Sequence, residues 1–194
     1  TFLFNTRVKT VEEGKIILED ETELSYDYTI ISTEASQLVK NVKNLEIKWK
    51  SCEAFYFETP VQTIKKPLIG LIADKDALIN NIFFHNSLKT TSSGPKELLS
   101  VTVVKKHHLT IEALQKQVEK ELKELCGIEN LKLIKQYSIE KALPDIKGLR
   151  YEMSPAETRL TKTIFKAGDI QLNASLNAAM IAGERAAMGV LDTI

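Results

Sequence analysis

The sequence predicts an α+β fold, and three observations support this class. Short apolar runs, either alternating or β-branched, fill the first 32 residues and much of the middle, with turn residues between them. A long amphipathic helical pattern follows them, and a helix rich in small residues closes the chain. Because both ends differ in character from the mixed middle, we expect the ends to pack together as one domain and the middle to form an insertion.

The first segment is predicted to hold three strands and a short helix. The strands are expected at 2–8, 15–18 and 28–31, and the helix at 35–39. Glu13-Gly14 is expected to form the turn that separates the first two strands.

The middle segment is predicted to combine strands with the clearest helix of the chain. That helix begins after Thr110 as N-cap, carries an apolar stripe and stops at Gly127, which suits a left-handed C-terminal cap. The stripe consists of Ile111, Leu114, Val118, Leu122 and Leu125. Strands are expected at 52–57, 68–72, 81–85, 98–104 and 131–139.

The last segment reads as a strand at 163–166, the pair Gly168-Asp169, a loop, and a helix from about Ser175 to Leu191. A glycine at a strand end lets a ligand approach the backbone, and an adjacent aspartate can accept hydrogen bonds from sugar or ribityl hydroxyls. The amino-terminal end of the helix favours partial negative charge. The alternative interpretation is a tightly packed strand and helix that bind no ligand.

The run AGDIQLNASLNAAMIAGERAA resembles the carboxyl-terminal flavin motif of the FAD-dependent amine oxidase and phytoene desaturase superfamily. In that family a strand ends in Gly-Asp, and a serine opens a helix containing small residues. The positions that match are Gly168, Asp169, Ser175, Leu176, Ala178, Ala179, Gly183, Ala186 and Ala187. Ala174 departs from the pattern, since the family often has proline or glycine there.

The amino-terminal run VKTVEEGKIILEDETELSYDYTIISTEAS resembles the passage of the same family that enters a β-meander and then returns to the main sheet. By this resemblance Val8 lies where the backbone meets the adenine ring. The two motifs occur in the order that the family requires, so together they are more specific than either alone.

The resemblance implies an α/β FAD-binding remnant, formed by 1–40 and 157–194 without its glycine-rich half. It also implies an inserted substrate-binding domain at 41–156, a mixed β-sheet with flanking helices. The flavin would lie between the two domains. The expected FAD-binding residues are Val8, Gly168, Asp169, Ser175, Leu176 and Ala178, and no catalytic residue is identified.

The implied activity is hydride removal from a C–N or C–C bond of a small molecule by the full-length protein. The chain by itself is expected to be inactive and to bind FAD poorly or not at all. Two other interpretations stay open: a non-catalytic α+β binding domain, and a flavin- or NAD-dependent isomerase that returns its hydride to the product.

Other reactive side chains have simpler explanations. His107 and His108 are expected to be solvated, since neighbours on a strand point to opposite faces and cannot readily share a metal; no metal site is predicted. His85 is expected to be an ordinary strand-end residue, with a place in a substrate cavity as the alternative. The aromatic cluster Trp49, Phe55, Tyr56 and Phe57 is expected to be core rather than a substrate cage.

Composition sets the remaining limits. The 26 basic and 26 acidic residues balance, which argues against nucleic-acid binding. No apolar run approaches the length that crosses a bilayer, although peripheral membrane contact and oligomers remain compatible with the sequence. Cys52 and Cys126 are far apart and are expected to be reduced and buried, which favours a cytoplasmic protein.

Overall fold

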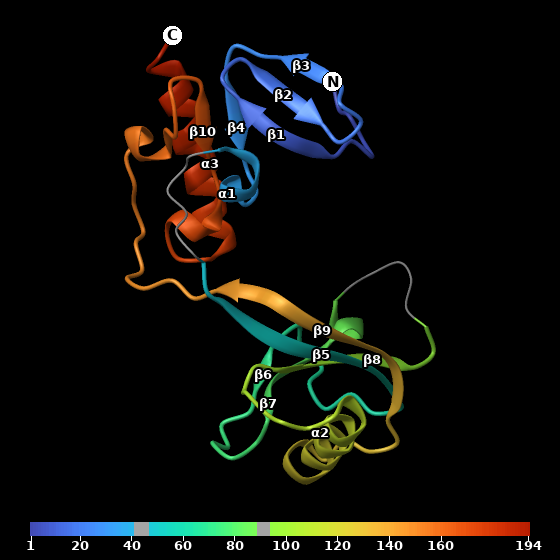
Figure 1. Ribbon diagram of the computed structural model, residues 1–194. Helices are drawn as coiled ribbons and strands as arrows, with labels where there is room; N and C mark the ends of the chain where they lie inside the picture. Colours follow the sequence, from blue (N-terminus) through green and yellow to red (C-terminus); the bar gives the residue numbers. More distant parts are fainter. Residues whose placement is uncertain (41–46, 89–93) are drawn as a thin grey trace. The chain divides into compact units, whose positions relative to one another are not determined.

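The structure is a computed structural model that describes residues 1–40, 47–88 and 94–194. It divides into two compact units, Thr1–Lys48 with Pro144–Ile194, and Trp49–Leu143. The first unit is thus built from both ends of the chain and the second from its middle (Figure 1). Helices and sheets occur in both units, in agreement with the α+β class. The roles expected for the two predicted domains stay predictions.

The first unit begins with a three-stranded antiparallel meander formed by β1 (Val8–Glu12), β2 (Lys15–Leu18) and β3 (Glu23–Ser25). The predicted strand at 2–8 is wrong, because the chain becomes extended only where the predicted strand ends. Asn5 has a left-handed φ of 55°, and the rings of Phe2 and Phe4 are 84% and 81% exposed. These rings contact one another and no buried core, so nothing draws the segment into the sheet.

A parallel pair of short strands joins the two ends of the chain. β4 (Thr29–Ile31) pairs with β10 (Ile164–Lys166), and Ala167 N donates to Ile31 O at 2.9 Å just beyond the pair. The buried side chains beside this pair form one cluster of Val11, Ile31, Val39 and Ile164. The short helix α1 (Ala35–Leu38) packs on the same cluster through its partly buried ends.

The closing helix α3 (Leu176–Leu191) packs closely on its own unit through small residues. Ala178 and Ala182 are fully buried beside Met153 and Leu172. A Cβ at Gly189 would lie 3.0 Å from Pro155 O, in the 3₁₀ segment η2 (Pro155–Thr158), so a larger residue would crowd this contact. Among the helices of the described ranges, none is long and apolar enough to cross a membrane.

The second unit is a five-stranded sheet with α2 (Ile111–Cys126) on one face (Figure 1). The strand order is β6 (Gly70–Leu71), β7 (Ile79–Phe84), β8 (Glu97–Val103), β5 (Trp49–Thr59) and β9 (Lys132–Pro144). β8 pairs antiparallel with both β5 and β7.

The cap residues and the apolar stripe of α2 are those that the sequence indicates. The Thr110 hydroxyl accepts from Ala113 N at 3.3 Å, and Gly127 ends the helix with a φ of 65°. Leu114, Val118 and Leu122 are completely buried against Phe55 and Phe57 of the sheet and their neighbours, whereas Ile111 and Leu125 at the two ends of the stripe are partly exposed.

Leu122→Ala should lower the free energy of unfolding by about 2–5 kcal/mol, because it leaves a cavity beneath α2. Leu125→Ala is the matched control: its side chain is 44% exposed, and we expect the smaller loss of a partly exposed contact. Urea unfolding followed by circular dichroism measures both. Equal losses in the two variants would contradict this packing of α2.

Candidate functional site

The two polar motifs of the sequence follow neighbouring strands in the first unit. Because β4 and β10 run parallel, their carboxyl ends lie at the same edge, where Ser32 and Thr33 follow β4 and Gly168 and Asp169 follow β10. In open α/β sheets, ligands bind outside the carboxyl ends of parallel strands. This edge is therefore the candidate functional site of the unit.

Gly168 has a backbone conformation that side-chain-bearing residues rarely adopt, with φ 150° and ψ 156°. A Cβ there would meet only Ile170 Cγ2, at 3.9 Å, so the constraint is conformational rather than steric crowding. Asp169 then opens the 3₁₀ segment η3 (Asp169–Gln171). Its half-buried carboxylate makes no hydrogen bond or ion pair within the described part of the chain. The strand end therefore presents an open backbone beside an available acceptor.

Gln171 is a residue of this edge that sequence reasoning missed. Its Nε2 donates to Lys166 O at 3.1 Å, while its buried Oε1 has no hydrogen-bond partner in the described ranges of the chain. A buried acceptor without a partner is costly, and a ligand donor would remove that cost. A lone glutamine in a loop carries no signal that would have revealed this from the sequence.

The loop into α3 is fixed by contacts to the segment that precedes η2. Arg150 N donates to Leu172 O at 3.2 Å, and Asn173 Nδ2 donates to Arg150 O at 2.9 Å. Glu157 accepts from Ser154 N and pairs with Arg150, both at 2.7 Å; these interactions, the Ser154 bond first, lower the pKa of the Glu157 carboxyl. The loop reaches the helix through Ala174, whose φ is 56°. A left-handed φ at this position explains why glycine suits it in the resembling family.

The expected residues of α3 occupy different environments. Ser175 is the N-cap, and its hydroxyl accepts from Ala178 N at 3.1 Å. Leu176 is 78% exposed, whereas the side chain of Ala178 is fully buried and its N–H is taken by the cap. The first-turn N–H groups, rather than the Ala178 side chain, are therefore the part of this helix that a ligand could use.

Val8 belongs to the same unit as the Gly168–Asp169 pair. It begins β1 opposite Leu18, and a register shift follows it before Thr10. Half-buried, it packs against the cluster that contains Ile31 and Ile164, one from each strand of the parallel pair. The structure thus packs the meander against the parallel β4–β10 pair through a shared core that includes the first residue of β10.

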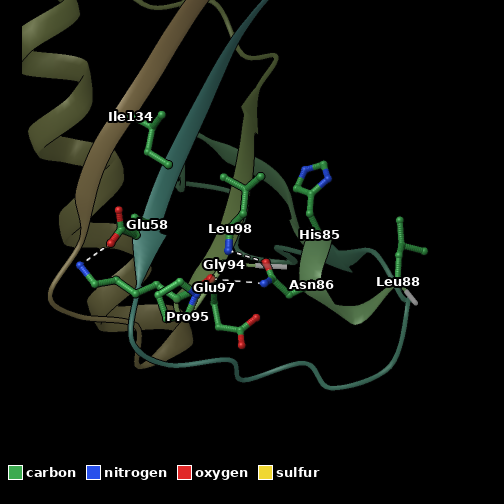
Figure 2. A pocket seen from close by; sticks show the side chains of 10 residues that line it. Glu58, His85, Asn86, Leu88, Gly94, Pro95, Glu97, Leu98 and Ile134 are labelled. Atoms are coloured by element: carbon green, nitrogen blue, oxygen red, sulfur yellow. Dashed lines mark hydrogen bonds and ion pairs between the residues drawn. The ribbon is translucent and has the colours of Figure 1, made fainter. Parts of the chain in front are cut away.

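The second unit has a cavity of about 460 Å³ at one end of its sheet. Figure 2 shows the side chains of Ile134, Leu98 and His85 on the same side of the sheet, while Glu97 points to the opposite side. Asn86 closes one wall, since its Oδ1 accepts from Leu98 N at 2.8 Å and its Nδ2 donates to Lys96 O at 3.2 Å (Figure 2). The full lining is Glu58, His85, Asn86, Leu88, Gly94, Pro95, Lys96, Glu97, Leu98 and Ile134.

The cavity lining carries two carboxylates, Glu58 and Glu97, and one ammonium group, Lys96. Lys96 forms an ion pair with Glu58, and its hydrogen bond lowers the pKa of the Glu58 carboxyl. His85 packs against the rings of Phe83 and Tyr56, with centroids 5.1 and 6.0 Å away, and its buried Nε2 has no hydrogen-bond partner among the residues that the structure describes. His85 directly follows β7, as expected for a strand-end residue, and it also lines this cavity.

The remaining candidates of the sequence divide between core and surface. Phe55 and Phe57 are completely buried beneath α2, whereas Tyr56 lies on the other face of the sheet with its ring near His85 and Tyr137. The expectation of an aromatic core therefore holds for Phe55 and Phe57 and not for Tyr56 or for Trp49, which is half-buried with Lys141 Nζ 5.6 Å from its ring centroid. Cys52 and Cys126 are free thiols, partly rather than fully buried, and burial raises the pKa of both. No group of metal-binding side chains occurs within the ranges that the structure describes.

Replacing each of two glycines of the last segment with alanine should change the free energy of unfolding in opposite directions. Gly168→Ala should lower the free energy of unfolding by about 1–2 kcal/mol, because alanine is strained at a φ of 150°. Gly183→Ala lies inside α3 with nothing within 4 Å of the new methyl group, so it should raise the free energy of unfolding by about 0.5–1 kcal/mol. Urea unfolding of both variants checks this. Stabilisation by Gly168→Ala would rule out the strained turn.

No family model matches the sequence, and no curated protein matches it. Among solved structures, a putrescine oxidase variant redesigned in its cofactor binding aligns with 98% of this chain at 11% identity and a TM-score of 0.68, over 49% of its own length. An oxidoreductase from Methanosarcina mazei aligns with 94% at 12% identity and a TM-score of 0.63, also over 49% of its length. A reduced UDP-galactopyranose mutase aligns with 74% at 14% identity and a TM-score of 0.56, over 36% of its length.

These similarities establish the fold. The chain spans about half the length of the two oxidoreductases, and the alignments cover 94% and 98% of this chain. Several structures to which the chain is similar are oxidases or other oxidoreductases, in agreement with the resemblance that the two end motifs carry. The chain therefore has a fold found in several oxidoreductases, among them putrescine oxidase and iminodiacetate oxidase.

Proposed function

We propose that this chain is the carboxyl-terminal portion of an FAD-dependent oxidoreductase that removes hydride from a C–N or C–C bond of a small molecule. The observation that carries the proposal is the parallel β4–β10 pair. It joins the meander that bears Val8 to the strand that ends in Gly168 and Asp169, and these are the two segments that resemble the flavin motifs.

The residues at this edge fit the cofactor. Asp169 offers an unpaired carboxylate to ribityl hydroxyls, Gly168 an open backbone, and Gln171 a buried acceptor without a partner. Ser175 caps α3, and Leu176 begins its first turn, whose N–H groups and dipole favour negative charge. FAD, when bound, supplies the hydride-accepting chemistry. The protein groups hold the cofactor and set the electrostatic environment around it.

We propose the cavity of the second unit as a separate binding site for a partly apolar small molecule. Its apolar residues Leu88, Leu98 and Ile134 can contact a hydrocarbon portion, and the rings around His85 extend the same face. The neutralised Glu58–Lys96 pair leaves this part of the wall without a net charge.

The glycine-rich half of the cofactor domain is proposed to lie outside the 194 residues. The span of about half of each oxidoreductase to which the chain is similar supports this. FAD binding by the 194 residues alone should then be weak, because the group that holds the pyrophosphate is missing.

The absorption spectrum of the full-length protein tests the proposal directly. We expect a yellow protein with flavin bands, and Asp169→Ala should lower FAD occupancy or weaken FAD binding by about tenfold or more, since a charge-assisted hydrogen bond is lost. Asp192→Ala is the matched control, because Asp192 lies at the opposite end of α3. Folded full-length protein that stays colourless when FAD is supplied would refute the proposal.

A second candidate, an isomerase that returns its hydride to the product, is supported by the similarity to UDP-galactopyranose mutase. Anaerobic mixing with candidate substrates distinguishes the two. An oxidoreductase should leave the flavin reduced and bleached until an acceptor is added. An isomerase should convert substrate to product with no net reduction of the flavin.

A further inference from the structure

Glu13 links two segments of the first unit that lie at opposite ends of the chain. It sits at the turn between β1 and β2, and its carboxylate reaches the residues immediately before β10. Oε1 accepts from Lys162 N at 3.0 Å, and Oε2 accepts from the hydroxyl of Thr163. One side chain therefore satisfies two donors of the segment that leads into β10.

The residues that Glu13 holds also set the start of the parallel pair. Thr163 O accepts from Thr29 N at 2.9 Å, and the three residues of β10 follow. Ala167 N then donates to Ile31 O, and Gly168 comes next. A slip of one residue would displace the strand end by about 3.3 Å and turn its side chains to the other face. A strand of three residues has few ladder bonds of its own with which to resist such a slip.

The turn that carries Glu13 belongs to the same meander as Val8. Val8 begins β1, the strand that leads into this turn, and Gly168 and Asp169 follow β10. We propose that Glu13 is a positioning residue for the cofactor site, because it fixes the meander that bears Val8 against the start of the strand that ends at Gly168. This inference rests on the proposed function and assigns a role to a residue that itself touches no ligand.

The surroundings of Glu13 favour its charged form. Hydrogen bonds from the hydroxyls of Thr161 and Thr163 and from the Lys162 backbone lower the pKa of the Glu13 carboxyl below its ordinary 4.5. Arg159 lies on the same turn, where its Nε donates to Thr161 O at 3.0 Å. Tyr26 is the titratable neighbour within the meander, and burial raises its pKa, so it stays neutral while Glu13 titrates. The stability that the charged Glu13 adds to the folded unit is therefore present above pH 4.5. It is lost as the pH falls through the lowered pKa of this carboxyl.

The test measures FAD affinity of the full-length protein in four variants. Glu13→Gln and Thr163→Val should each weaken FAD binding about three- to tenfold, because each removes part of the same link. The variant with both substitutions should bind FAD no more weakly than whichever single variant binds FAD less tightly, since both substitutions remove the same interaction. The matched control is Glu12→Gln, which loses only exposed ion pairs to Lys15 and Lys40, both at 3.8 Å, and should bind FAD within about twofold of wild type.

Two further readouts separate positioning from general destabilisation. Without FAD, amide hydrogen exchange at Ala167 and Thr29 should be faster in Glu13→Gln than in Glu12→Gln, because these amides bond across the parallel pair. The wild-type advantage over Glu13→Gln in FAD affinity should be largest near neutral pH and shrink toward none below pH 4.5.

The outcomes decide separately on the two proposals. If Glu13→Gln and Thr163→Val match Glu12→Gln in FAD affinity and in exchange at Ala167, the positioning role is overturned while the flavin proposal stands. If wild-type full-length protein binds no FAD, the proposed function fails and this role fails with it. Should Glu13→Gln not fold, Thr163→Val alone decides, since it keeps the carboxylate and removes the hydroxyl that donates to it.

Discussion

The parallel pairing of β4 with β10 is the constraint on which the first unit depends. These two strands come from opposite ends of the chain, and each contributes only three residues to the pair. Their backbone bonds, with the buried side chains of Ile31 and Ile164 beside them, close a unit that neither end could form alone. The edge at which both strands finish is consequently the place where polar groups from distant parts of the sequence meet.

The small residues of α3 allow close packing, and they also match the flavin motif that the sequence resembles. Ala178 and Ala182 are buried against Met153 and Leu172, and Gly189 permits close approach to η2. These contacts would be required even without a ligand. What they do not explain is the backbone conformation of Gly168, which only glycine adopts readily, or the Asp169 carboxylate and the buried Gln171 Oε1, which have no partner among the described residues. Those three features are the ones that favour a binding site over a simple packed helix.

The two faces of the sheet in the second unit serve different purposes. One face buries Phe55 and Phe57 beneath α2 and supplies the core of the unit. The other carries Tyr56 and Phe83 beside His85, and the cavity at its end combines apolar side chains with a neutralised ion pair. Alternation along each strand makes this division possible, since neighbouring residues project to opposite faces.

The sequence by itself determined the features that depend on near neighbours. The caps of α2 at Thr110 and Gly127, the start of α3 at Ser175 and the core of β10 follow from local periodicity and capping chemistry, and the two end motifs indicated the fold. Only the tertiary structure decided that β1 begins at Val8 rather than Phe2, that Tyr56 faces His85, and that Glu13 reaches the start of β10. Each of these depends on partners far away along the chain. Local propensity does not encode such partners, because burial and hydrogen bonding there are set by packing that forms only once the two ends meet.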